Sequence, residues 1–202
     1  MISGWQDRTM ATSPTIDYVR VADVLTDLGM ITRETAQRVL DDFGDLAHGA
    51  LTRHDHIAAA LEDFGVAVSI HADDVDFADA HYPWLLEEAA ALTGGKVTVD
   101  NFRFARADED DEDNGRGTLY FDRNGKELSF LIEQESNDYL DMGAAQAAIE
   151  ELSPDDDPRS FRCVDNGPGN SLGTMDDIMV LATAEQREGL GRHLGLSFRE
   201  PW

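Results

Sequence analysis

The chain has little lysine, a single cysteine and no long hydrophobic run. Lys96 and Lys126 are its only lysines, so almost all of its 16 basic residues are arginines, and they face 41 acids. The formal net charge is -25. A field of this sign repels DNA, RNA and anionic lipid and attracts basic proteins. We therefore expect no direct binding to nucleic acid, and a basic protein as partner.

The scarcity of cysteine and of apolar runs argues against disulfide-stabilised, cysteine-zinc and membrane-spanning proteins. Cys163, the one cysteine, permits neither a disulfide framework nor a cysteine-based zinc site, and it suits a reducing compartment, so a cytoplasmic protein is expected. No run approaches the roughly 20 apolar residues of a membrane span, so no membrane association is expected. Residues 1–13 lack the charged and apolar regions of a signal peptide and are expected to be disordered.

The acidity itself permits two interpretations. It is either a surface for association with a basic partner or a background adaptation, because acidic surfaces also keep proteins hydrated in strong brine. Composition favours neither interpretation, and it specifies no oligomeric state.

Residues 14–95 are predicted to be mainly helical. Ser13-Pro14 is a typical helix start, because a capping hydroxyl precedes a proline at the first helical position. Thr32 and Thr52 are predicted to cap a second and a third helix. The three segments carry apolar residues at helical spacing, which favours packing against each other or against a sheet.

A short strand and a further helix complete this part of the chain. Val66 to Ile70 alternate as a strand does, and this strand is expected to join the sheet as an edge. Acidic, helix-like sequence then runs from Asp73 to His81. A break is expected at Tyr82-Pro83, because the residue before a proline avoids the helical conformation. A helix from Trp84 to Leu92 follows.

The stretch from Lys96 to Gln134 gives the clearest structural signal. Asn124-Gly125 predicts a two-residue β-hairpin turn, because both turn positions need positive φ. The alternation changes parity at Asp100-Asn101, which predicts a β-bulge. The apolar pairs expected from the turn are Phe121 with Leu128 and Leu119 with Phe130.

Residues 96–202 are predicted to follow the order β-β-β-α-β-β-α. Ser136 or Asn137 is expected to cap the first of these helices, and Thr183 with Gln186 makes a capping box for the last. Short links favour antiparallel pairing. The predicted fold is α+β, with a helical N-terminal half followed by an antiparallel sheet covered by helices, as one unit or two closely packed subdomains.

An acidic run is the first candidate site, and it comprises Asp108, Glu109, Asp110, Asp111, Glu112 and Asp113. A calcium-binding EF-hand loop needs glycine at its sixth position and a bidentate glutamate at its twelfth. If Gly115 takes the sixth position, the twelfth is Phe121, so an EF-hand loop is excluded. The interpretations left are an irregular calcium site, a solvated mobile loop, and a contact surface for a basic partner. Trp84 and Tyr139, the aromatics nearest to acidic segments, are candidate contact residues.

A group of carboxylates is the second candidate, where a strand gives way to a helix. Its members are Glu133, Glu135, Asp138 and Asp141. Carboxylates at a strand end serve acid–base chemistry or hold a cation, which suits a metal-dependent hydrolase. The alternative is a polar strand end followed by capping residues. No nucleophile or oxyanion donor accompanies the group, so no catalytic residue, metal ligand or cofactor is assigned.

Other reactive side chains have structural explanations. His54 and His56 flank Asp55, but positions i and i+2 do not share a helix face, so no metal site is assigned. Cys163 lies in a predicted strand and is expected to be a buried small hydrophobe. The glycine-rich segment Gly167 to Thr174 lacks the pattern of a phosphate-binding loop and is expected to connect a hairpin.

In overall character the chain is small, acidic, α+β and without a catalytic motif. In this character it resembles the acidic immunity proteins of bacterial toxin systems. The resemblance implies a tight complex with a basic toxin domain, whose active site is blocked. A metal-dependent hydrolase is the alternative, and a nucleic-acid mimic or a halophilic housekeeping protein is a third reading.

Overall fold

The computed structural model describes residues 15–71, 78–107, 116–133, 139–165 and 176–200. The helices are α1 (Tyr18–Asp27), α2 (Arg33–Phe43), the 3-10 helix η1 (Gly44–His48), α3 (His54–Asp63), α4 (Ala78–Leu92), α5 (Met142–Glu150) and α6 (Ala184–Leu194). The strands are β1 (Ala67–His71), β2 (Val99–Arg106), β3 (Arg116–Arg123), β4 (Lys126–Glu133), β5 (Ser160–Asp165), β6 (Asp176–Ala182) and β7 (Ser197–Phe198). The predicted α+β class is confirmed, and the predicted order β-β-β-α-β-β-α holds for β2 to α6, but β7 after α6 was not predicted.

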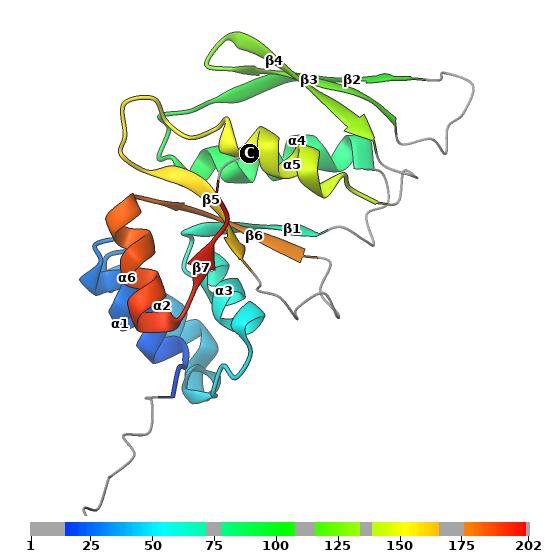
Figure 1. The fold of residues 1–202 in the computed structure, drawn as a ribbon. Coiled ribbons are helices and arrows are strands. Elements are labelled where there is room, and N and C mark those ends of the chain that lie inside the picture. The colour runs from blue at the N-terminus through cyan, green and yellow to red at the C-terminus, as the bar shows by residue number, and fades with distance from the viewer. Residues whose placement is uncertain (1–14, 72–77, 108–115, 134–138, 166–175, 201–202) are drawn as a thin grey trace, which may run out of the picture.

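The strands form two antiparallel sheets, a division that the sequence does not reveal. One sheet has the order β1-β6-β5-β7 and the other β2-β3-β4. Figure 1 shows α4 and α5 between the two sheets, and α1, α2, α3 and α6 on the far side of the four-stranded sheet. None of the described helices covers the outer face of the three-stranded sheet (Figure 1). β1 is an edge strand beside β6, as predicted.

The predicted hairpin register is confirmed residue by residue. Asn124 and Gly125 have φ of 52° and 76°, as a tight turn of this handedness requires. Phe121 pairs with Leu128 and Leu119 with Phe130. The predicted bulge is also present, as a register shift between Asp100 and Arg103, with Asn101 at φ 55°.

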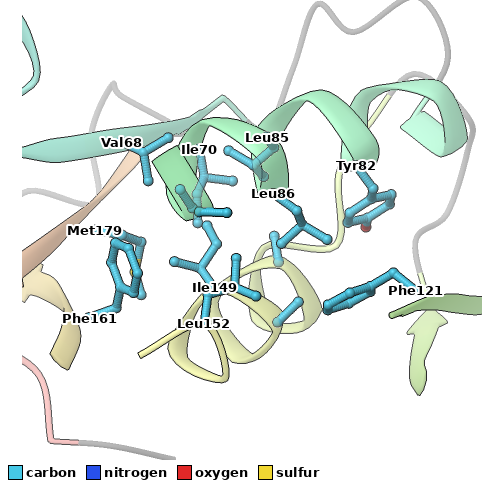
Figure 2. Packing of buried hydrophobic residues seen from close by; sticks show 14 of the residues in the cluster. Val68, Ile70, Tyr82, Leu85, Leu86, Phe121, Ile149, Leu152, Phe161 and Met179 are labelled. Atoms are coloured by element: carbon cyan, nitrogen blue, oxygen red, sulfur yellow. The ribbon is translucent and has the colours of Figure 1, made fainter. Parts of the chain in front are cut away.

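The first core fills the space between the two sheets. Figure 2 shows side chains of α4 and α5 meeting there, with Phe121 from one sheet and Phe161 from the other closing the two sides. The ring of Phe121 lies 5.8 Å from that of Phe102 and 5.7 Å from that of Phe130. Because β1 and α4 belong to this cluster together with β3, β5 and β6, the predominantly helical first part and the strand-rich second part share one core.

A second core lies on the other face of the four-stranded sheet. Apolar side chains of α1, α2, α3 and α6 pack there against Val164, Ile178 and Val180. Adjacent residues of β5 and β6 therefore contribute to different cores, as expected for strands buried on both faces.

Three predicted helix starts are wrong. Asp17, and not Ser13-Pro14, caps α1, and its side chain accepts a hydrogen bond from the N–H of Arg20. α3 starts one residue later than Thr52 predicts, because Arg53 is the N-cap. Asp141, rather than Ser136 or Asn137, caps α5. Several residues with capping side chains precede α1 and α5, and tertiary contacts select among them, whereas Arg53 makes no side-chain capping bond to α3.

The break expected at Tyr82-Pro83 is also wrong, because α4 runs through Pro83. Pro83 is the sixth residue of α4, so it lacks the N–H that would bond to the carbonyl four residues earlier. Tyr82, Leu85 and Leu86 on either side are fully buried, and their burial outweighs that loss.

Other termini follow the sequence pattern. Thr32 caps α2, and Thr183 with Gln186 forms the expected capping box of α6. Gly195 ends α6 in the left-handed conformation, with φ 75°. The chain then returns as β7, which pairs with β5.

Candidate protein-binding surface

Several strand ends meet on one side of the molecule. Figure 1 shows the ends of β1, β2 and β4 and the start of α4 on this side. We call it the strand-end surface and define it by His71, Trp84, Arg116, Glu133 and Tyr139. Arg116 and Glu133 are paired across β3 and β4.

Asp141 links the elements beneath this surface through hydrogen bonds. Its Oδ2 accepts a hydrogen bond from the N–H of Glu133 at 2.9 Å, which joins the end of β4 to the start of α5. Its own N–H donates to Oη of Tyr82 at 3.1 Å, which joins α5 to α4. Tyr82 is fully buried, and burial raises the pKa of its hydroxyl above the usual value. The strand-end surface therefore rests on a rigid frame.

The carboxylate group is only partly assembled. Oδ1 of Asp141 accepts the N–H of Ala144 at 3.0 Å as the helix cap, so both of its carboxylate oxygens have structural partners. The side chain of Glu133 is exposed. Glu135 and Asp138 lie outside the described residues. For Asp141 the capping interpretation thus has direct support, and no acid–base role is needed to explain its position.

The acidic run Asp108 to Asp113 lies outside the described residues, but its attachment points are defined. β2 ends at Arg106, and β3 begins at Arg116. The N–H of Ala107 donates to the carbonyl of Arg116 at 2.9 Å, so the backbone pairing of β2 with β3 continues up to the acidic run. The ends of β1 and β4, which the segments 72–77 and 134–138 follow, lie on the same side as the end of β2. Like the run, these two segments contain acids and no lysine or arginine.

Two exposed aromatics accompany these acidic segments. Trp84 is 46% exposed and Tyr139 is 47% exposed. The ring of His81 lies 5.0 Å from that of Trp84. Desolvation lowers the pKa of His81, and the proximity of His71 adds to the effect. The end of β1 and the start of α4 therefore lie close together beneath Trp84.

Basic side chains elsewhere are largely neutralised within the fold. Arg53 pairs with Asp55 at 2.6 Å, Arg123 with Asp155 at 3.0 Å, and Arg159 with Asp157 at 2.7 Å. Lys96 also reaches Asp157 at 3.1 Å. Since acids outnumber bases so heavily, such pairing leaves the surplus of negative charge to the remaining surface.

The structure contains a buried polar cluster that the sequence pattern does not indicate. Asp177 is 8% exposed and accepts hydrogen bonds from Gln146 of α5 and from Arg199, whose Nη2 lies 3.0 Å from Oδ1. Cys163 lies beside it, and burial raises the pKa of this thiol to about 12. The cluster joins α5, β6 and the C-terminal segment, and its groups satisfy one another. The prediction that Cys163 is a buried hydrophobe is confirmed.

The histidines of α3 and one internal cavity give no evidence of a site within the described residues. His54 and His56 stand at the start of α3, and the described ranges contain no group of three or more His, Cys, Asp or Glu side chains arranged to hold a metal ion. A cavity of about 140 Å³ is lined in part by Arg159 and Gln186. Arg159 is held by Asp157, and Gln186 by the backbone of Thr183 and Leu28.

Comparison with known proteins supplies no relative. No family model, no curated protein and no solved structure matches this chain. Among the helices that the structure describes, none is both long and apolar enough to cross a bilayer.

Proposed function

We propose that this chain is an acidic protein-binding module that neutralises a basic partner, in the manner of an immunity protein that inhibits a toxin. The observation that carries the proposal is that the ends of β1, β2 and β4 lie on one side of the molecule (Figure 1), because the acidic segments 72–77, 108–113 and 134–138 follow these strand ends in the sequence. A cluster of one charge sign on a rigid frame attracts a partner of the opposite sign and orients it before contact.

Charge and aromatic surface have separate tasks in this proposal. The acidic segments accelerate the encounter, because complementary potentials raise association rates by about 10- to 1,000-fold. Trp84 and Tyr139 supply the affinity, because aromatic side chains that become buried at an interface contribute most of the binding energy. Their anchors in the fold are the buried neighbours Leu85 and Leu140, which hold both segments in place before the partner arrives.

The hydrolase alternative has less support. It needs carboxylates that are free to accept a proton or bind an ion, whereas both oxygens of Asp141 are bonded to backbone N–H groups. The halophile alternative accounts for exposed acids on every face, including those of the helical layer, but it assigns no role to the three acidic segments that follow β1, β2 and β4.

The partner can be captured from a native lysate at low salt and identified by mass spectrometry. We expect a basic protein to be retained at about 0.05 M salt and released near 1 M, where the screening length falls to about 3 Å. Retention should be lost when the six acids from Asp108 to Asp113 are replaced by serine and asparagine.

A matched variant controls for the change in net charge. It replaces six exposed acids of the helical layer, namely Asp23, Asp27, Glu34, Asp42, Asp45 and Glu188. This variant should retain the partner. Equal loss from both variants would show that only the total charge matters, and equal retention by both would remove the acidic run from the interface.

A further inference from the structure

The two sheets present four edges, and three of them are protected against pairing with another strand. At the β1 edge, Glu62 accepts hydrogen bonds from the N–H of Ser69 at 3.2 Å and from its hydroxyl at 2.5 Å. β2 carries the bulge at Asp100, and β7 is two residues long. Bulges, short strands and covering side chains are the usual means of protecting an edge.

β4 is the exception among the described strands. It runs regularly for eight residues, and all eight are paired with β3 in unbroken register. It contains no proline and no bulge. An open edge of this length is a template for strand addition.

The hairpin register determines which backbone groups of β4 face outward. Lys126 closes the two-residue turn, so it and every second residue after it bond to β3. The N–H and C=O groups of Glu127, Ser129, Leu131 and Glu133 therefore point away from β3. Of these, the N–H of Glu133 is bonded to Asp141. Within the part of the chain that the structure describes, the backbones of Glu127, Ser129 and Leu131 have no hydrogen-bond partner.

The side chains beside this edge have a defined chemistry. Glu127, Ser129, Leu131 and Glu133 share the outer face of the sheet, and all are exposed. Leu131 is 65% exposed. An apolar side chain thus lies near the middle of the open edge, with a carboxylate at each end.

We propose that β4 accepts an extended, basic segment of the partner as a fourth, antiparallel strand of the three-stranded sheet. The incoming strand would carry basic residues opposite Glu133 and Glu127 and an apolar residue opposite Leu131. These three positions share one face, with spacings of two residues from Glu133 to Leu131 and four from Leu131 to Glu127. The basic character of the added strand rests on the proposed function. The geometry of strand addition does not depend on it.

A second copy of the chain fits this edge poorly. Antiparallel pairing of two β4 strands about Phe130 would place Glu127 of one copy opposite Glu133 of the other, at both ends of the contact. Like charges that face each other across strands destabilise the pair, and the net charge of -25 on each chain adds to the repulsion. The same two carboxylates attract lysine or arginine.

The probe is a capped seven-residue peptide with lysine at positions one and seven, valine at position three and threonine elsewhere. It is titrated into the full-length, isotope-labelled protein while amide NMR signals and hydrogen exchange are recorded. We expect the amides of Glu127, Ser129 and Leu131 to shift and to become protected from exchange. N-methylation of peptide positions three and five, whose N–H groups would face β4, should weaken binding by about tenfold or more. N-methylation at positions four and six should change it little.

Substitution of the protein gives an independent test. Ser129→Pro removes an outward N–H without breaking a bond to β3, and Ser129→Ala keeps that N–H. The first should abolish the protection of Leu131 by the peptide, and the second should preserve it. If Ser129→Pro fails to fold, the pair of N-methylated peptides still decides the question.

The outcomes separate strand addition from the proposed function. Peptide shifts confined to Arg116 and Tyr139, with equal affinity for both N-methylated peptides, would overturn strand addition and leave charge-driven binding intact. Strand addition would also be overturned if the peptide shifted no amide signal, or if the protein formed a stable dimer through β4. If the peptide adds to β4 while the acidic-run variant retains its lysate partner unchanged, strand addition holds and the proposed role of the run fails.

Discussion

Replacing Asp141 by alanine tests whether this carboxylate is structural or chemical. The substitution removes two hydrogen bonds, one to the N–H of Ala144 at 3.0 Å and one to the N–H of Glu133 at 2.9 Å. Loss of an aspartate cap costs about 1 kcal/mol, and loss of the second bond costs about 1 kcal/mol more. We therefore expect the free energy of unfolding to fall by at least about 2 kcal/mol.

Urea denaturation followed by tryptophan fluorescence measures this loss. For a chain of 202 residues, the same loss lowers the melting temperature by about 4–8 °C. Asp141→Asn retains one acceptor oxygen, so its loss should be about half as large. Glu133→Ala removes an exposed side chain and should change stability by less than about 0.5 kcal/mol.

The reasoning would be refuted if Asp141→Ala changed stability no more than Glu133→Ala does. That result would mean that the two backbone N–H groups find other partners without cost, and it would return Asp141 to the set of carboxylates available for chemistry. Amide exchange at Glu133 gives a second readout, because this N–H should lose its protection in the alanine variant and keep it in wild type.

Three further outcomes follow from the fold. Phe121→Ala, which empties the space between Phe102 and Phe130, should cost about 3–5 kcal/mol in urea denaturation, and a loss below about 1 kcal/mol would contradict the packing described. Cys163, whose pKa burial raises to about 12, should resist a thiol reagent at pH 8 until the protein unfolds; prompt labelling of the folded protein would show that the thiol is accessible. Hydrogen bonding from Arg159 holds the pKa of Asp157 well below its usual range. This carboxylate therefore stabilises the fold at pH values above its unfolded-state pKa of about 3.9. Its contribution is lost as the pH falls toward the lower, folded-state pKa. The stability difference between wild type and Asp157→Asn should therefore narrow from about pH 5 to about pH 2, and a constant difference would contradict the ion pair.

Local signals in the sequence predicted local structure well. The turn at Asn124-Gly125 and the apolar alternation beside it specify the same register, and the structure has that register. The capping box of Thr183 with Gln186 needs residues only three apart. In both cases the information lies within a few residues of the element it determines.

Long-range choices were not visible in the sequence. The continuation of α4 through Pro83 depends on burial of Tyr82 against residues far along the chain. The hydrogen bond from Gln146 to Asp177 joins residues 31 positions apart. The division into two sheets likewise depends on which faces α4 and α5 cover, and a strand with apolar alternation fits either sheet.

The candidate site shows the same contrast. Asp141 was recognised as part of a polar group, but its role as the cap of α5 was assigned to Ser136 or Asn137, because each of these side chains can cap a helix. Trp84 and Tyr139 are exposed, and their role as contact residues stays a prediction. The open edge of β4 was missed, because the predicted hairpin gave no indication that β4 would lie at the border of a separate sheet.

The association rate of the captured partner, measured by stopped-flow at several salt concentrations, tests the central claim most directly. The claim predicts a rate that falls steeply with salt for wild type. At low salt it also predicts a rate at least about tenfold lower when Asp108 to Asp113 are neutralised. The variant neutralised on the helical layer should stay close to wild type. A rate that is independent of salt, or equal in the two neutralised variants, would contradict the capture of a basic protein through the acidic run.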